Sequence, residues 1–304
     1  MTTVIARNKV LVADRRKIVN YRKLDVIGVR NEAKIYKEPF CLYGVAGYEA
    51  TPAINGYGMS RELLLRRLAV LFALSYYTES KEKRKLLYGL PGASPIMIES
   101  MVASWGEMRT IMGMQVAREL NEFSQSVVAM GQFNTMHFTD GEFLTMPNTD
   151  TVLLGAGARH AVILIDNGYS YDKIYPALRR AGVPTGETYD MFTVEDDLPD
   201  LMPPISHPTL VRTIATLMRK AIRWEMKKGM LTPESAIGPR RALAENLATF
   251  LSLGNTLRGN YWVFSKKPIW DWTTPQSKKH RHYQLACNFV GIKAEKENKE
   301  ESKS

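Results

Sequence analysis

Cysteine is scarce in this sequence: its 304 residues contain only Cys41 and Cys287. Two cysteines exclude a disulfide framework and are typical of a protein kept in a reducing compartment, so we expect a cytoplasmic location. Long apolar runs are missing too. The most apolar stretch, residues 63–77, is interrupted by Arg66 and Arg67 and is too short to cross a membrane. The first residues lack the basic segment and apolar stretch of a secretory signal, and we expect none.

Several site signatures are also missing. The five histidines do not show the spacing of a metal site, and no Gly-x-Ser-x-Gly elbow indicates a serine hydrolase. Gly155-Ala156-Gly157 has the first two glycines of a dinucleotide fingerprint, but His160 stands at the third position and no βαβ unit surrounds it. We therefore expect neither a metal nor an organic cofactor.

The net charge of +10 is concentrated in one part of the chain. Residues 205–292 contain 14 Lys/Arg and 4 Asp/Glu, while residues 293–304 contain four of each sign and all other residues together are neutral. This distribution predicts a neutral domain over residues 2–204 and a basic, largely helical extension over 205–292. The Lys/Glu/Ser-rich residues 293–304 are predicted to form a disordered tail.

The pattern of apolar and turn-forming residues predicts strands, two long helices, more strands, two shorter helices and a last strand. This order differs from the regular alternation of a doubly wound sheet. It favours the α+β class, with two antiparallel sheets between helix layers in a four-layer αββα sandwich. Residues 80–96 are predicted as a loop. The expected strands are 3–6, 10–13, 25–29, 33–36, 40–45, 126–132, 135–138, 142–146, 151–154 and 188–194. The expected helices are 60–77, 96–124, 158–165, 171–181, 207–228 and 233–253.

The start of the chain carries its most informative residue. Removal of Met1 would leave Thr2 as the first residue, with a hydroxyl and a free α-amine on the same residue. Such an amine can act as the base that activates the hydroxyl as a nucleophile. Taken alone, a threonine after the initiator methionine is ordinary, so its interpretation depends on the rest of the sequence.

Four local patterns together resemble the proteasome β-subunit family of N-terminal-nucleophile (Ntn) hydrolases, which includes bacterial ring proteases. The resemblance covers about residues 2–197 and does not extend over 205–304. Its specificity comes from the order and spacing of the patterns, which are Thr2-Thr3-Val4-Ile5-Ala6, Val12-Ala13-Asp14-Arg15-Arg16, Ala33-Lys34-Ile35 followed by a strand to Ala46-Gly47, and Leu154-Gly155-Ala156-Gly157-Ala158 followed by Asp166-Asn167-Gly168-Tyr169-Ser170-Tyr171-Asp172.

The resemblance implies a role for each of four residues. Thr2 would be the nucleophile, with its own amine as base. Lys34 would be the cation beside the Thr2 hydroxyl, and Asp14 would hold that lysine. The Gly47 amide would donate a hydrogen bond to the oxyanion. The family also implies a homo-oligomeric ring, a peptide or unfolded protein as substrate, and an ATP-driven unfoldase as a further partner.

The chain departs from the family pattern at two places. Ala156 stands where the family has the serine of Gly-Ser-Gly, which helps to organise the threonine amine. Thr185-Gly186-Glu187 replaces Ser-Gly-Gly, and the aspartate expected three residues earlier falls near Gly182.

Three hypotheses follow. The first is a threonine peptidase, with other amide hydrolysis left open. The second is a catalytically weak or inactive assembly or binding protein on the same fold. The third is contact of residues 205–292 with nucleic acid or an acidic partner, against the simpler interpretation of these residues as a helical extension with a charged outer face.

Overall fold

The computed structural model divides the chain into two compact units, residues 1–76 with 113–204 and residues 77–112 with 205–304. The division into domains expected from the charge distribution stays a prediction. The structure describes residues 3–21, 26–47, 59–79, 81–88, 94–183, 185–197, 207–253, 256–258, 261–263, 272 and 274–293.

The first unit begins with a tight hairpin of β1 (Thr3–Arg7) and β2 (Val10–Asp14). Asn8 and Lys9 between them both have a positive φ, of 50° and 62°. A two-residue turn of this kind matches the right-handed twist of the flanking strands. The hairpin forms the centre of a four-stranded antiparallel sheet in the order β10-β1-β2-β11, with β10 at Val152–Gly155 and β11 at Tyr189–Thr193.

A second antiparallel sheet has five strands in the order β5-β6-β7-β8-β9. Asp140 and Gly141, both with positive φ, form the turn between β8 and β9, as the sequence predicts. A separate hairpin, β3 (Arg16–Tyr21) with β4 (Val26–Asn31), precedes this sheet. The strands of the second sheet are β5 (Ile35–Glu38), β6 (Cys41–Gly47), β7 (Gln125–Met130), β8 (Thr135–Thr139) and β9 (Glu142–Met146).

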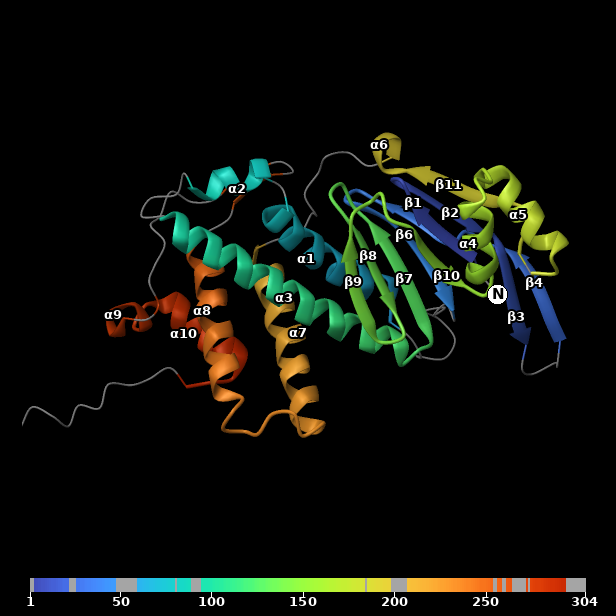
Figure 1. Ribbon diagram of the computed structural model, residues 1–304. Coiled ribbons are helices and arrows are strands. Elements are labelled where there is room, and N and C mark those ends of the chain that lie inside the picture. The colour runs from blue at the N-terminus through green and yellow to red at the C-terminus, as the bar shows by residue number, and fades with distance from the viewer. Residues whose placement is uncertain are drawn as a thin grey trace, which may run out of the picture. The chain divides into compact units, whose positions relative to one another are not determined.

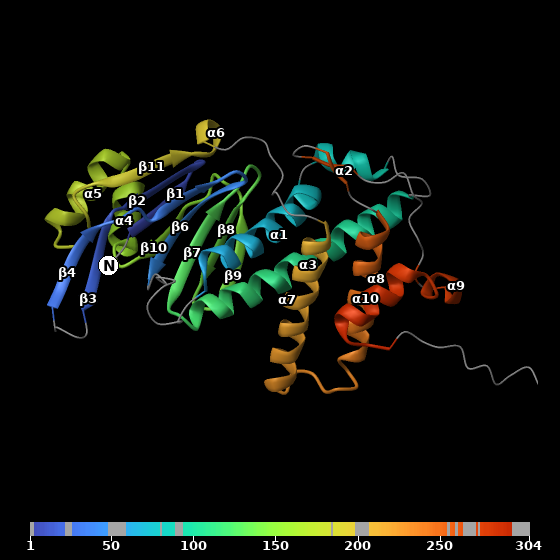
Figure 2. The ribbon, with the colours of Figure 1, turned by 180° about the vertical axis from the view of Figure 1, so that it is seen from behind.

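Alternation along β1 and β2 places the two faces of the first sheet in different cores. Val4 and Leu11 belong to a core shared with Leu42 and Val128 of the second sheet. Ile5 and Val12 belong to a core shared with the helices α4 (Ala158–Asp166) and α5 (Tyr171–Arg180). These two helices lie beside the first sheet in both ribbon views (Figures 1 and 2). The period-2 pattern of β-branched and small apolar residues is what allows one strand to serve two cores.

Helical residues of the first unit also contact the second sheet. Phe133, just before β8, makes an edge contact with Tyr76 of α1 (Arg61–Glu79), at 5.7 Å between ring centroids. Gly113 of α3 (Pro95–Asn121) lies directly against the Phe143 ring of β9. The first unit is therefore α+β with two antiparallel sheets, as predicted.

In the second unit, α7 (His207–Lys227), α8 (Ile237–Leu253) and α10 (Arg281–Val290) pack together (Figures 1 and 2). The Trp272 indole donates a hydrogen bond to the Thr249 hydroxyl at 2.9 Å and stacks on Tyr283. The shorter elements of the second half of the chain are α6 (Val194–Asp197), α9 (Pro275–Lys278), β12 (Thr256–Arg258) and β13 (Tyr261–Val263).

Two expectations were wrong. The segment 80–96 is not a loop throughout, because α2 occupies Lys81–Tyr88 and α3 begins at Pro95. The charged residues of α2 mask its helical pattern. The strand β3 was also missed, since its sequence Arg-Lys-Ile-Val-Asn-Tyr contains only two consecutive β-branched apolar residues and has no regular alternation. Among the described residues, no helix combines the length and apolarity needed to cross a membrane.

Candidate active site

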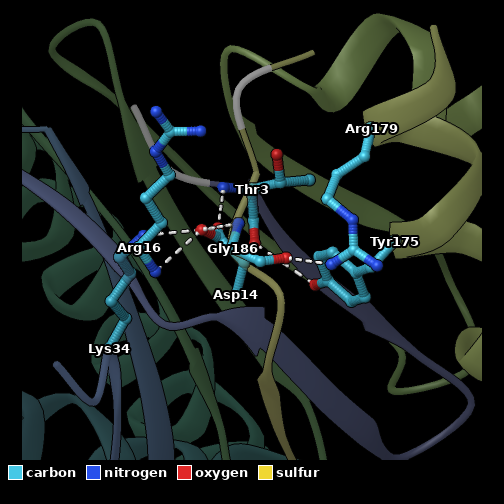
Figure 3. Close-up of polar contacts among 7 residues, drawn as sticks. All are labelled: Thr3, Asp14, Arg16, Lys34, Tyr175, Arg179 and Gly186. Atoms are coloured by element: carbon cyan, nitrogen blue, oxygen red, sulfur yellow. Dashed lines mark hydrogen bonds and ion pairs between the residues drawn. The ribbon is translucent and has the colours of Figure 1, made fainter. Parts of the chain in front are cut away.

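Asp14, the last residue of β2, is completely buried and accepts hydrogen bonds from four groups (Figure 3). Its Oδ1 accepts from the backbone N–H of Thr3 at 2.7 Å. Its Oδ2 accepts from the backbone N–H groups of Arg16 and Gly186 and from Lys34 Nζ, each at 3.1 Å. Hydrogen bonds to a charged acceptor are stronger than neutral ones, and here they replace the water that a buried carboxylate loses.

Lys34 is nearly as buried as its partner, with 9% of its side chain exposed. It lies directly before β5, and its carbonyl accepts a hydrogen bond from the N–H of Val45 at 3.1 Å. This bond ties the lysine to β6, on which Gly47 lies two residues further along. The fold thus brings Lys34 into contact with Asp14 and places Gly47 on the strand beside it.

Gly47 has a backbone conformation that other residues rarely adopt. Its φ is +103°, and a Cβ added there would lie 2.1 Å from the carbonyl oxygen of Ser124. Any side chain would therefore both strain the backbone and clash with its neighbour. The glycine is a structural requirement at this exposed end of β6, whatever else its amide does.

Thr2 lies outside the described residues, and the description of the site begins at Thr3. Thr3 is buried and pairs with Gly155 across β1 and β10. Its N–H donates to Asp14, and its carbonyl accepts a hydrogen bond from the Tyr175 hydroxyl at 3.3 Å. Burial, and then the nearby charge of Asp14, raise the pKa of Tyr175 well above its usual value. The residue that follows Thr2 is thus held on both sides of its backbone.

The loop after β10 approaches Thr3 closely. A Cβ added to Gly157 would lie 2.1 Å from Thr3 Oγ1 and 3.1 Å from Thr3 Cγ2. A larger residue would clash there, so the second glycine of Gly155-Ala156-Gly157 makes room for the Thr3 side chain. Ala156 between them is exposed and offers no hydroxyl.

The segment Thr185–Gly186 supplies a polar group that sequence reasoning did not assign. Arg179 of α5 donates to the Gly186 carbonyl at 2.7 Å, while the Gly186 N–H donates to Asp14. Thr185, directly before it, is 3% exposed, and its hydroxyl has no hydrogen-bond partner among the described residues. The signal was the position of this threonine where the family pattern has a serine. Gly182, near the expected aspartate, is an exposed residue after α5 with a φ of +77°.

Arg16 takes part in the site through its backbone. Its guanidinium does not bind the carboxylate, and its buried Nε has no partner in the described part of the chain (Figure 3). The described residues contain no group of three or more His, Cys, Asp or Glu side chains that could hold a metal ion. The hydrogen bonds to Asp14 hold backbone segments and the Lys34 ammonium in place. Groups held in this way are suited to acid–base and electrostatic catalysis.

Comparison with known proteins gives a coarse structural likeness. No protein family matches the sequence, and no curated protein matches it. The chain is similar in structure to eukaryotic HslV from Trypanosoma brucei, with 16% identity and a TM-score of 0.35 over 63% of this chain and 98% of that one. It is also similar to Anbu (ancestral beta-subunit) from Yersinia bercovieri, with 15% identity and a TM-score of 0.33 over 71% and 93% of the two chains. A Gly-1 mutant of Anbu from Hyphomicrobium sp. strain MC1 is similar as well, with 12% identity and a TM-score of 0.34 over 75% of this chain and 97% of that one. The likeness concerns the fold alone, and with TM-scores below 0.5 it carries no conclusion on activity.

Proposed function

We propose that this protein is a threonine-type hydrolase, acting on peptides, with Thr2 as its nucleophile after removal of Met1. The observation that carries the proposal is the position of Asp14. One buried carboxylate accepts a hydrogen bond from the residue next to Thr2 and another from Lys34. Thr2 is joined to Thr3 by a single peptide bond, so the carboxylate that holds the backbone of Thr3 also holds the ammonium group of Lys34.

In the proposed reaction, the Thr2 hydroxyl oxygen attacks the carbonyl carbon of the scissile bond, and its proton passes to the Thr2 α-amine. The Gly47 amide donates to the developing oxyanion, and the charge of Lys34 favours the anionic form of the nucleophile. The C–N bond then breaks, the amine returns the proton to the leaving nitrogen, and an ester to Thr2 remains. Water hydrolyses this ester and restores the hydroxyl. Neither a metal nor an organic cofactor takes part.

Thr185 is proposed to position the Thr2 amine, in place of the serine missing at Ala156. Its buried hydroxyl has no hydrogen-bond partner in the described part of the chain, and its neighbour Gly186 donates to Asp14. A buried hydroxyl without a partner is costly, so a hydrogen bond to the amine would stabilise both groups.

The finer architecture belongs to the same proposal. The contacts of α4 and α5 with the first sheet, and of α1 and α3 with the second, support a four-layer αββα sandwich of the Ntn-hydrolase type over residues 2–204. The proposal includes a homo-oligomeric ring in the cytoplasm, served by an ATP-driven unfoldase, with residues 205–292 as an appended basic region.

The test combines intact-mass measurement with peptide cleavage. The purified protein should lack the mass of Met1, and Thr2→Ala should abolish turnover of a fluorogenic peptide library while leaving the circular dichroism spectrum unchanged. Thr3→Ala is not a suitable control because Thr3 is buried. Thr151→Ala, the same chemical change at an exposed residue directly before β10, should keep full turnover. A retained Met1 or an unchanged rate for Thr2→Ala would refute the proposal.

Thr185→Val tests the positioning role separately, since valine keeps the shape and loses the hydroxyl. We expect kcat to fall about 10–100-fold with little change in KM, and its pH profile to shift because the amine loses a partner. Thr185→Ser should restore the rate. Equal loss in the valine and serine variants would indicate a purely structural residue.

A second candidate function rests on Ala156. An exposed alanine where a hydroxyl is expected favours a catalytically weak or inactive protein that uses this fold for assembly or binding. A covalent threonine-directed inhibitor separates the two. An adduct on Thr2, located by peptide mass mapping, supports the hydrolase; the absence of any adduct on a protein that lacks Met1 supports the binding protein.

A further inference from the structure

A row of cationic side chains follows one face of α7. We call five of these residues the cationic stripe: Arg212, Arg219, Lys220, Arg223 and Lys227. Thr216 lies on the same face. At about 100° per residue, all six positions fall within an arc of about 100°. From Arg212 to Lys227 the stripe is about 22 Å long, at about 1.5 Å per residue.

The stripe is turned to solvent. Arg212, Lys220, Arg223 and Lys227 are exposed, and Arg219 is half-buried. The opposite face of α7 is apolar and buried, as shown by Leu210, Ile214, Leu217, Ala221 and related residues. The helix packs against α8 and α10, and the stripe lies on the face opposite its buried apolar residues.

Three cations of the stripe have no ion pair within the described residues. Arg212, Arg223 and Lys227 form no ion pair with any residue in the described part of the chain. The single acidic residue of α7, Glu225, lies on the other side of the helix from the stripe. Unpaired like charges in a row repel one another, so their arrangement costs free energy unless a polyanion is bound.

The stripe fits a phosphate backbone better than a protein surface. Protein interfaces bury apolar and aromatic side chains at their centre. No large apolar side chain is exposed on the part of α7 whose side chains are described, residues 209–227. Arginine, which supplies three of the five cations, has a planar fork that matches phosphate oxygens. A row of cations without a large exposed apolar side chain beside it is suited to a row of phosphates.

We propose that the cationic stripe binds the sugar–phosphate backbone of a nucleic acid without sequence preference. This function is independent of the proposed hydrolase, because it uses neither Thr2 nor any group of the Asp14 site. Binding neutralises several phosphates at once and releases their counterions, which makes the affinity fall steeply with salt.

Fluorescence anisotropy with the full-length protein tests the proposal. The probes are labelled 20-nucleotide single-stranded DNA, the same sequence as duplex DNA, and the corresponding RNA. Five phosphate contacts predict a slope of log K against log salt of about −4.5 for duplex DNA and about −3.5 for single strands. The affinity for the duplex should therefore fall about 10²–10³-fold between 50 and 200 mM salt. The three probes distinguish DNA from RNA as the backbone bound.

The double variant Arg212→Glu/Arg223→Glu should lower the affinity at 50 mM salt at least 10-fold and make the slope shallower by about 1.4–1.8. The matched control is Lys173→Glu/Arg180→Glu, which changes the net charge equally at two exposed residues of α5. Binding in the control should remain within twofold of the original protein.

Three results would overturn the proposal: no binding of any probe at 50 mM salt, equal losses in the two double variants, or tighter binding of polyglutamate of the same charge. The last result would assign the stripe to an acidic protein instead. Peptide turnover, measured in parallel, should be unchanged in Arg212→Glu/Arg223→Glu, so failure here leaves the proposed hydrolase untouched.

Discussion

The first compact unit buries the carboxylate of Asp14 completely, whereas the second leaves Arg212, Arg223 and Lys227 exposed on α7. Asp14 accepts four hydrogen bonds, one at Oδ1 and three at Oδ2. The arginines and the lysine have no ionic partner in the described part of the chain.

The difference separates two uses of charge. A buried, fully bonded charge determines where backbone segments lie, and its loss damages the fold. An exposed, unpaired charge contributes little to stability and remains available to another molecule. Substitutions in the two regions should therefore differ in size and in kind, and the following four predictions test this from the largest effect to the smallest.

Asp14→Ala should lower the free energy of unfolding by about 3–5 kcal/mol, because it leaves the Lys34 ammonium and three backbone N–H groups buried without their acceptor. Urea denaturation followed by circular dichroism measures the change. The control is Asp172→Ala, at an exposed position on α5, which should stay within about 0.5 kcal/mol of the original. Similar losses at the two positions would show that Asp14 does not organise the unit.

Gly157→Ala should cost about 1–3 kcal/mol, because the new Cβ would meet the Thr3 side chain at 2.1 Å. Gly106→Ala makes the same chemical change inside α3, where a Cβ has nothing within 4 Å, and should stabilise by about 0.5–1 kcal/mol. Thermal unfolding of the two variants shows directly whether each change stabilises or destabilises the protein. Stabilisation of both variants would contradict the close contact between Gly157 and the Thr3 side chain.

Tyr175→Phe should cost about 1 kcal/mol at neutral pH, for the lost hydrogen bond to Thr3. Because the pKa of Tyr175 is raised in the folded protein, its contribution is complete below pH 10 and is lost as the pH rises from there toward the folded-state pKa. Urea titrations at pH 8, 10 and 11 should show a smaller alkaline loss in Tyr175→Phe than in the original protein. Tyr169→Phe, at an exposed tyrosine, should leave the alkaline loss unchanged.

Arg212→Glu/Arg223→Glu should change the free energy of unfolding by no more than about 0.5 kcal/mol in 150 mM salt, since neither arginine has a described ionic partner. Differential scanning calorimetry at low and high salt measures this change in stability. A loss above 2 kcal/mol would mean that the stripe has a structural role, and the contrast between the two units would disappear.

Local patterns were enough to predict much of the fold. Alternation in Thr3–Arg7 and Val10–Asp14, the turn at Asp140-Gly141 and the apolar face of α7 each act over a few residues, so they are visible in the sequence. The pairing of β1 with β10, across some 150 residues, depends on which buried faces fit together and has no local signature.

The residues of the candidate site also divide into those that the sequence indicates and those that it does not. The apolar strand before Asp14 favours its burial, and the family resemblance directs attention to Lys34 and Gly47. The donors Arg16 and Gly186 act through their backbone, which is common to all residues except proline, so no residue type marks them. The Thr185 hydroxyl becomes notable only when its burial and lack of a described partner are known.

The four hydrogen bonds to Asp14 also have a consequence for motion. The amides of Thr3, Arg16 and Gly186 come from three separate segments but end on one side chain. An opening that displaces the Asp14 side chain removes the acceptor of all three amides at once. We therefore expect the three to exchange at similar rates in native-state hydrogen exchange, as a single opening event, although they lie up to 183 positions apart in the sequence.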